Sequence, residues 1–264
     1  MKNIKIECEF IQFDLYHEKQ IELYVNKIPT DKTNDNLVRF VYLIEPFEIL
    51  DLRNLALSRQ GITYDFLLTH DEFLLTNVKN SFLTEFGSCW IKDPTPKKEY
   101  SLSFLCGGKT ITEGHQLRQS LWNREQSINN IQKKFFISGN FKGNLQNSKL
   151  YPTLGTTKNP LFESQFHICI ENIKSNNWFT EKLIDCFYTK TIPIYWGCPN
   201  INAWFDTRGM IVVNTVDDII DAAQNLNDSL YESLMPHVHE NFARCQKFVD
   251  INEHIRNKLL QVLQ

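Results

Sequence analysis

Short hydrophobic segments alternate with amphipathic helical patterns along most of this chain, and this alternation constrains its fold more than any other feature. Each segment either ends in polar residues or glycine or is followed by a polar or turn segment, as strands are. The segments are KIECEF, VRFVYLI, YDFLLT, LSFLCGG, KKFFISG, HICIEN, TIPIYWG and MIVVN. Strands separated by helices are typical of parallel sheets covered by helices on both faces. The sequence therefore predicts an α/β fold.

A polar, proline-containing stretch from Asp93 to Ser101 divides this pattern into two regions. Each region has its own strands and helices, which predicts two Rossmann-like domains with parallel sheets. We expect an N-terminal domain over residues 1–95, a second domain over 101–245 and a C-terminal helix over 246–264. Open parallel sheets bind ligands beyond the carboxyl ends of their strands, so functional residues are expected directly after the strands.

Charge and hydropathy exclude several classes of function. The formal net charge is only -3, so no global positive field would hold the protein on nucleic acid or on an acidic membrane. No apolar run reaches the roughly 20 residues that a membrane-spanning helix needs. The first residues also lack the apolar core and cleavage site of a signal peptide. We therefore expect a soluble protein in the cytoplasm of a bacterium or of a virus-infected host cell.

The seven cysteines form no CxxC pair and are an odd number. Without a predicted secretory signal, disulfides are not expected, and the spacing does not fit a zinc site. We predict reduced, mostly buried thiols.

The most informative segment is FHICIENIKSNNWFTEKLIDCFYTKTIPIYWGCPNI, residues 166–201. Thr180 can cap a helix that begins at Glu181, and a helix amino terminus beside a lysine, here Lys182, suits a diphosphate. Glu181 can accept hydrogen bonds from a ribose diol, and Asn172 can donate to a phosphate oxygen. Taken singly, Glu181 could equally complement the helix dipole and Lys182 could be a solvated surface residue.

This segment resembles the donor-binding signature of the α-1,3/1,4-fucosyltransferase family. The features that carry the resemblance are Phe166 with the Glu171–Asn172 pair, an aromatic residue at Trp178, TEKL from Thr180 to Leu183, and IPIYWGCP from Ile192 to Pro199.

In that family the asparagine, the aromatic residue and the Glu-Lys pair contact the GDP part of GDP-fucose. The resemblance therefore implies donor-binding roles for the residues Asn172, Trp178, Glu181 and Lys182, with Glu171 and Thr180 as secondary candidates. Trp178 departs from the family, in which a tyrosine is usual at this place. An indole can donate a hydrogen bond but cannot accept one as a phenol does.

The upstream segment LSFLCGGKTITEGHQLRQSLWNRE, residues 102–125, resembles the part of the family that opens the donor domain. Arg118 is thereby implied to face the diphosphate, where a guanidinium would neutralise charge on the leaving nucleotide. Gly107 and Gly108 replace the family's usual Ser-Asn, so backbone N–H groups must serve this turn, and Gly107 is a secondary candidate. Substitutes for Arg118 are His115, Lys109 and Arg124.

The first hundred residues match the family more weakly, but the order of parts agrees. Glu45 follows VYLI, at the place of the family's proposed general base. Inverting transfer needs a carboxylate that takes the proton of the acceptor hydroxyl as this hydroxyl attacks. Asp71 is the secondary candidate, Glu72 and Glu48 also lie near strand ends, and a strand-end carboxylate with no catalytic part remains an alternative.

The resemblance implies a GT-B-like architecture of two facing Rossmann-type domains and a direct inverting displacement. No DxD-like motif follows a strand, so no metal is expected; Arg118, Lys182 and the helix start at Thr180 would supply the electrostatic stabilisation. The implied reaction moves L-fucose from GDP-fucose onto a glycan hydroxyl. Alternatives are a UDP-sugar donor such as UDP-xylose, and a non-catalytic nucleotide- or carbohydrate-binding protein.

Overall fold

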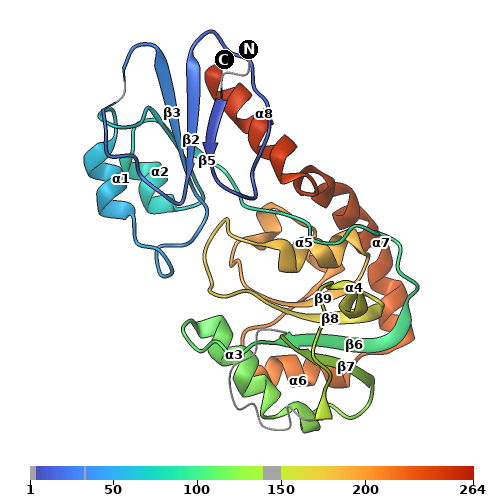
Figure 1. The fold of residues 1–264 in the computed structure, drawn as a ribbon. Coiled ribbons are helices and arrows are strands. Elements are labelled where there is room, and N and C mark those ends of the chain that lie inside the picture. The colour runs from blue at the N-terminus through green and yellow to red at the C-terminus, as the bar shows by residue number, and fades with distance from the viewer. Residues whose placement is uncertain (1–3, 33, 139–149) are drawn as a thin grey trace. The chain divides into compact units, whose positions relative to one another are not determined.

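The computed structural model describes residues 4–32, 34–138 and 150–264, which form two compact units (Figure 1). The first unit holds the chain up to Phe86 together with Asn176–Trp178 and Asp250–Gln264. The second unit holds Gly87–Ser175 and Phe179–Val249. The N-terminal part of the first unit thus ends at Phe86, whereas the sequence predicted a boundary at residue 95. Most of the expected C-terminal helix, from Asp250 onward, belongs to the first unit.

The first unit contains a five-stranded parallel sheet in which the strands lie in chain order. The strands are β1 (Ile4–Glu7), β2 (Gln20–Val25), β3 (Leu37–Leu43), β4 (Phe66–Thr69) and β5 (Ser81–Leu83). The helices are α1 (Arg53–Arg59), α2 (Glu72–Asn77) and α8 (Ile251–Leu263).

The alternation of side chains along β3 supplies two hydrophobic cores, one on each face of this sheet. Phe40 and Tyr42 pack in a cluster that includes the apolar side chains of α8. Val41 and Leu43 belong to the opposite cluster, which includes side chains of α1 and α2. Figure 1 shows α8 on one side of these strands and α1 and α2 on the other.

The second unit contains a five-stranded parallel sheet with the order β10-β9-β8-β6-β7. The strands are β6 (Glu99–Cys106), β7 (Gln132–Ile137), β8 (Ser164–Ile170), β9 (Ile192–Trp196) and β10 (Ile211–Val212). The α-helices are α3 (Glu113–Trp122), α4 (Asn159–Phe162), α5 (Glu181–Tyr188), α6 (Val216–Gln224) and α7 (Asp228–Cys245). Short 3₁₀ helices are η1 (Glu125–Ser127), η3 (Ile201–Ala203), η4 (Thr207–Gly209) and η5 (Gln246–Phe248).

Helices cover both faces of this second sheet (Figure 1). One core joins the strands to α3 and α6, through residues such as Trp122 and Ile219. The other core joins them to α4 and α5, through Phe162 and Phe187. Helix α7 contributes side chains to both cores.

The strand order of the second sheet reverses beside β6. The chain passes from β6 through α3 to β7 on one side, whereas β8 lies on the other side of β6 and leads through α5 to β9. Loops that leave two neighbouring strands in opposite directions open a crevice at the strand ends, and ligands of open α/β sheets bind there. The site is therefore expected beyond Cys106 and Ile170.

Two other expectations concern the chain as a whole. The seven cysteines are unpaired in this structure, and five of them are buried, as expected for mostly buried thiols. Their reduced state stays a prediction. Among the described helices, none is both long and apolar enough to cross a bilayer.

Candidate functional site

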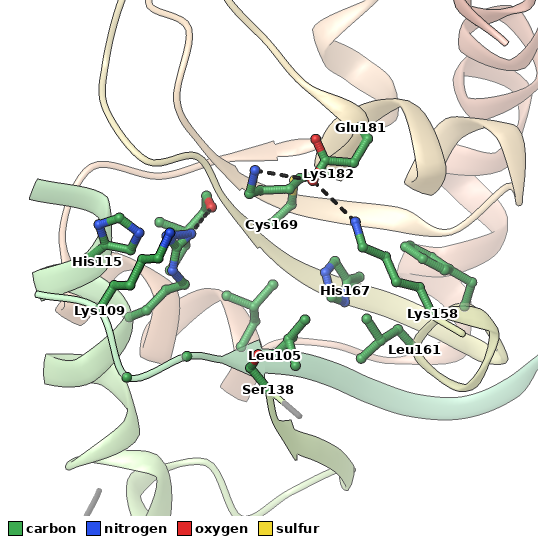
Figure 2. A pocket seen from close by; sticks show the side chains of 16 residues that line it. Leu105, Lys109, His115, Ser138, Lys158, Leu161, His167, Cys169, Glu181 and Lys182 are labelled. Atoms are coloured by element: carbon green, nitrogen blue, oxygen red, sulfur yellow. Dashed lines mark hydrogen bonds and ion pairs between the residues drawn. The ribbon is translucent and has the colours of Figure 1, made fainter. Parts of the chain in front are cut away.

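A cavity of about 500 Å³ lies at the strand-order reversal of the second unit (Figure 2). Its apolar wall includes Leu105, Leu161 and Phe162. Its basic side chains come from three separate segments of the chain, and they are Lys109, His115, Arg118, Lys158 and Lys182. An apolar wall with converging cations suits a ligand that has both a ring system and negative charge.

Arg118 and Asn172, which the sequence assigned to the same ligand, lie in direct contact. The guanidinium of Arg118, on α3, donates to the backbone carbonyl of Ile170 and, over 2.7 Å, to Oδ1 of Asn172. These bonds fix the guanidinium at the end of β8 while using two of its five donors. Burial lowers the pKa of Arg118, but a guanidinium keeps its charge at neutral pH.

Helix α3 reaches this position because Gly114 lets it approach the loop after β8. The N–H of Gly114 donates to the carbonyl of Asn172 over 2.9 Å. A Cβ atom at Gly114 would lie 1.8 Å from the carbonyl oxygen of Glu171, which no real contact allows. A residue without a side chain is therefore required for Arg118 to reach the end of β8.

Glu171 holds the start of α5 and does not line the cavity. Its fully buried carboxylate accepts from the backbone N–H of Thr180 over 2.8 Å and from the Thr180 hydroxyl over 2.7 Å. Nζ of Lys182 lies 3.5 Å from the same carboxylate. Thr180 is the N-cap residue of α5, as the sequence predicted. Glu171 thus fixes the TEK segment by charge-assisted hydrogen bonds.

Glu181 lies between two lysines at the edge of the cavity (Figure 2). Its Oε1 atom is 3.2 Å from Nζ of Lys158 and 3.4 Å from Nζ of Lys182. Burial alone would raise the pKa of Glu181, but Lys182 and Lys158 outweigh it and hold this pKa at about 2. Burial opposes the charge of Lys182, yet Glu181 and Glu171 raise its pKa. Both side chains are therefore charged at neutral pH.

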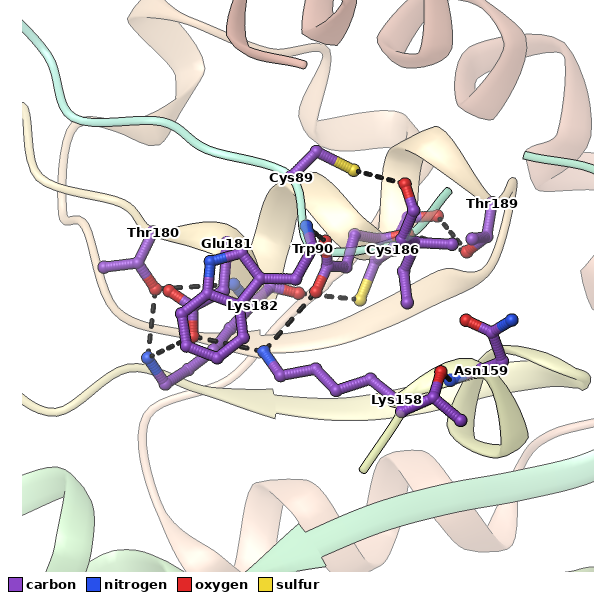
Figure 3. Close-up of polar contacts among 12 residues, drawn as sticks. Cys89, Trp90, Lys158, Asn159, Thr180, Glu181, Lys182, Cys186 and Thr189 are labelled. Carbon is purple, nitrogen blue, oxygen red and sulfur yellow. Dashed lines mark hydrogen bonds and ion pairs between the residues drawn. The ribbon is translucent and has the colours of Figure 1, made fainter. Parts of the chain in front are cut away.

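Lys158, which Figure 3 shows reaching toward Glu181, and Asp185 extend this network. The sequence analysis identified neither residue. Nζ of Lys158 lies 3.4 Å from Asp185 and 4.1 Å from the centre of the Trp90 ring. Asp185 is fully buried and also accepts the backbone N–H of Trp90 over 2.7 Å. Asp185 follows Glu181 by four residues, so both lie on one face of α5. This spacing could have indicated Asp185 from the sequence. No local pattern singled out Lys158.

The histidines of the cavity are neutral. Burial, followed by the nearby cations Arg118 and Lys109, lowers the pKa of His115 to about 4. Burial, followed by Lys158 and Lys98, lowers the pKa of His167 to about 3. The positive charge that faces a ligand at neutral pH therefore comes from arginine and lysine.

Of the remaining candidates for donor binding, two glycines line the cavity and Arg124 does not. Gly107 and Gly108 line the cavity, as expected for a turn served by backbone groups. Arg124 forms a surface ion pair with Asp217 and does not line the cavity, so it is no substitute for Arg118.

Trp178 groups with the first unit and is absent from the cavity lining. Its buried indole N–H donates to the carbonyl of Ile44 over 3.1 Å. The donor-binding role that the resemblance implied for Trp178 stays a prediction. The one donor of its indole is bonded to the residue before Glu45.

Glu45 is half-buried directly after β3, and its backbone is firmly held. The N–H groups of Ile44 and Glu45 both donate to Oδ1 of Asn26, over 2.8 and 3.1 Å. Asn26 adopts a left-handed conformation with φ of 52°, which asparagine tolerates better than most residues. With Trp178 bonded to the carbonyl of Ile44, this peptide is anchored on both sides.

The competing carboxylates of the first unit have structural partners. Asp71 pairs with Arg53 through both oxygens, over 2.6 and 3.0 Å, and caps α2. Glu72 accepts from the side chains of Asn176 and Asn177. These bonds hold both carboxylates in place at the start of α2. Glu45 stays the general base that the resemblance implied.

No metal-binding group was expected from the sequence. Within the part of the chain that the structure describes, no cluster of three or more histidine, cysteine, aspartate or glutamate side chains could hold a metal ion.

Two α/β units with parallel sheets, the second with a cationic cavity at its strand-order reversal, belong to the GT-B-like fold class. The family model described as glycosyltransferase family 10 (fucosyltransferase), C-terminal part, matches residues 112–256, and the chain belongs to this family. The resemblance in the sequence, the α/β GT-B-like fold class and the assignment as a glycosyltransferase are confirmed.

Individual proteins agree with this result. The chain is 34% identical over 83 residues to the α-(1,3)-fucosyltransferase FucT of Helicobacter pylori; the match covers 28% of this chain and 17% of that relative. A solved α1,3-fucosyltransferase aligns with 94% of this chain and 77% of its own, at 15% identity and a TM-score of 0.54. TarM aligns with 92% of this chain and 54% of its own, at 12% identity and a TM-score of 0.55. These two structures support the fold.

Proposed function

We propose that this chain transfers L-fucose from GDP-fucose to a hydroxyl of a glycan acceptor, with inversion and without a metal ion. The observation that carries the proposal is the cationic cavity at the strand-order reversal of a chain that belongs to a fucosyltransferase family. The acceptor oxygen attacks the anomeric carbon as the bond from this carbon to the diphosphate oxygen breaks. GDP leaves, and the acceptor's proton passes to Glu45.

The contacts of the second unit support the donor roles that we propose for its side chains. Arg118 and Lys182 neutralise the charge that develops on the diphosphate as the glycosidic bond breaks. The amide N–H₂ of Asn172 binds a phosphate oxygen, since its Oδ1 atom already accepts from Arg118. Glu181 accepts hydrogen bonds from the hydroxyls of the ribose, and Lys158 keeps Glu181 ionised and oriented.

These cations are also the reason for proposing independence of metal. A fixed guanidinium and two ammonium groups beside the start of α5 supply the charge that a divalent ion supplies elsewhere. A location in the cytoplasm stays a prediction from the sequence.

The test is a calorimetric and thermal-shift titration of the purified protein with GDP, UDP, GDP-fucose and UDP-xylose, each with and without EDTA. We expect GDP and GDP-fucose to bind and stabilise the protein equally well with the chelator present. Selective binding of UDP and UDP-xylose would show that the donor is a UDP-sugar and not GDP-fucose. Loss of binding in EDTA would refute metal independence.

A transfer assay distinguishes an enzyme from a binding protein. Incubation with GDP-fucose and a panel of neutral oligosaccharides should yield a fucosylated product with the anomeric configuration opposite to that of the donor. Donor binding without any product would favour the non-catalytic alternative, and retained configuration would contradict the direct displacement.

A further inference from the structure

An exposed aromatic surface adjoins Glu45 in the first unit. Glu45 lines a small hollow together with Phe47, Arg53 and Asp71. Phe47 is 39% exposed, and Phe73, on the neighbouring helix α2, is 46% exposed. We call these four side chains Phe47, Arg53, Asp71 and Phe73 the Phe47–Phe73 surface.

This surface is built around the guanidinium of Arg53. The guanidinium carbon lies 3.6 Å from the centre of the Phe47 ring and 5.1 Å from that of Phe73. Both oxygens of Asp71 accept from Arg53, and Asp71 also accepts from the backbone N–H groups at the start of α2. A planar guanidinium held by two hydrogen bonds and stacked on a ring has little freedom left. The two aromatic rings are therefore attached to a fixed polar centre.

Charge separates this surface from the cavity of the second unit. Its basic group, Arg53, is already paired with a carboxylate, and Glu45 adds a negative charge. A phosphate or a nucleotide would be repelled or would have to break the Arg53–Asp71 pair. A neutral ligand with hydroxyl groups and an apolar face fits better, because such a ligand can contact rings and exchange hydrogen bonds with the polar rim.

We propose that the Phe47–Phe73 surface is a binding site for a neutral pyranose of the acceptor glycan, which stacks its C–H face on these rings and points a hydroxyl toward Glu45. This inference rests on the proposed function, since the reacting hydroxyl is placed by its contact with Glu45, the proposed general base. Arg53, whose side chain is 28% exposed, binds a further hydroxyl from the rim, and Asp71 keeps the guanidinium in place. Phe47 and Phe73 then determine the affinity for the acceptor and leave the affinity for the donor unchanged.

The test uses the variants Phe47→Ala and Phe73→Ala of the full chain. The matched control is Ile62→Ala, which removes a side chain of the same unit that is 45% exposed and does not line the hollow. We expect each phenylalanine variant to raise the KM for an oligosaccharide acceptor about tenfold, which corresponds to about 1.4 kcal/mol. The KM for GDP-fucose should change less than twofold, and Ile62→Ala should behave as the parent.

A binding measurement that needs no turnover runs in parallel. Saturation-transfer NMR with N-acetyllactosamine should show contact between the saccharide and the parent protein, weakened in both phenylalanine variants and kept in Ile62→Ala. Thermal unfolding verifies that the variants are folded. An unchanged acceptor KM and unchanged saturation transfer in both variants would overturn the inference, as would absence of saccharide contact in the parent.

The same data separate this inference from the proposed function. If saccharide contact depends on Phe47 and Phe73 but GDP-fucose gives no product, the acceptor site stands and the proposed reaction fails. If product forms and neither variant alters acceptor KM, the reaction stands and the acceptor site fails.

Discussion

The two units share one plan, a five-stranded parallel sheet with helices on both faces, but they use the ends of their strands differently. In the second unit the strand order reverses, and buried charges gather beyond β6 and β8 around a cavity. In the first unit the strands follow chain order, and a small hollow at the ends of β3 and β4 is lined by Phe47 and by Arg53, which also contacts the exposed ring of Phe73. The reversal opens a crevice lined by cations, where we propose that the donor binds, whereas the surface of the first unit is the one we propose for a neutral saccharide.

Substitution of Glu45 should show the largest difference between the units. Glu45→Gln removes the proton acceptor while keeping the shape of the side chain, so we expect transfer to fall by about 10²- to 10⁴-fold. The affinity for GDP should stay the same, because the charges that bind it lie in the second unit. Initial rates and GDP calorimetry measure the two effects.

The control for this experiment is Glu48→Gln, which changes an exposed carboxylate of the same loop. Its turnover should match that of the parent. Parent-like turnover by Glu45→Gln would remove Glu45 from the mechanism, and a loss of GDP affinity in this variant would break the division of labour between the units.

The buried carboxylate Asp185 should make the second unit sensitive to pH. Burial, against the opposing effect of Lys158, raises the pKa of Asp185 from 3.8 to about 6. The native state therefore holds this proton more tightly than the unfolded state, and stability falls as pH rises from about 4 to 6, by about 3 kcal/mol. Asp185→Asn has no such carboxylate to ionise. The free energy of unfolding of the variant, relative to that of the parent, should therefore rise between pH 4 and pH 6.

The groups around Asp185 do not confuse this measurement. The pKa of Glu181 is about 2, and burial raises the pKa of the Cys89 thiol to about 12, so neither group titrates between pH 4 and 7. Denaturant unfolding of parent and variant at pH 4, 5, 6 and 7 gives the difference directly. Asp217→Asn, at an aspartate whose side chain is 73% exposed, is the matched control. Parallel pH profiles of the parent and Asp185→Asn would contradict the prediction.

Removal of a single cation from the cavity should weaken donor binding, by less than the substitution of Glu45 lowers the rate of transfer. We expect Lys182→Ala and Arg118→Ala each to weaken GDP binding by about 1.5 to 3 kcal/mol, as is typical for the loss of a charge-assisted hydrogen bond. Arg124→Ala serves as the control because its ion pair with Asp217 lies on the surface. Calorimetry that finds all three variants as tight as the parent would show that the diphosphate binds elsewhere.

The sequence predicted the second unit better than the first. Hydrophobic runs gave the strands, and the short spacing from Asn172 to Lys182 kept the donor candidates within one loop and one helix turn. The helix that carries Arg118 was also predicted, because its pattern follows β6 after a short glycine-containing turn. The family model, which matches residues 112–256, covers this same region.

Contacts between distant parts of the chain could not be predicted. Lys158 reaches Glu181 from a segment without a distinctive pattern, and nothing local indicates that its ammonium lies over Trp90. Trp178 was assigned by its place in a motif, but its direction depends on the carbonyl of Ile44, 134 residues away along the chain. Motifs record which residues are close in sequence, whereas side-chain direction is decided by tertiary packing.

Helix α8 has a consequence for how the protein is made. Its side chains Ile255 and Leu259 cover Phe40 and Tyr42 of the first sheet, although the whole second unit lies between them in the chain. On the ribosome, strands β1 to β5 emerge early, but one face of their sheet stays exposed to water until translation has passed through the second unit. Pairing over such a distance is slow, and nascent chains with an uncovered sheet are prone to aggregate. The first unit to be synthesised is thus the last to be completed, and we expect chaperones to bind the nascent chain at this face.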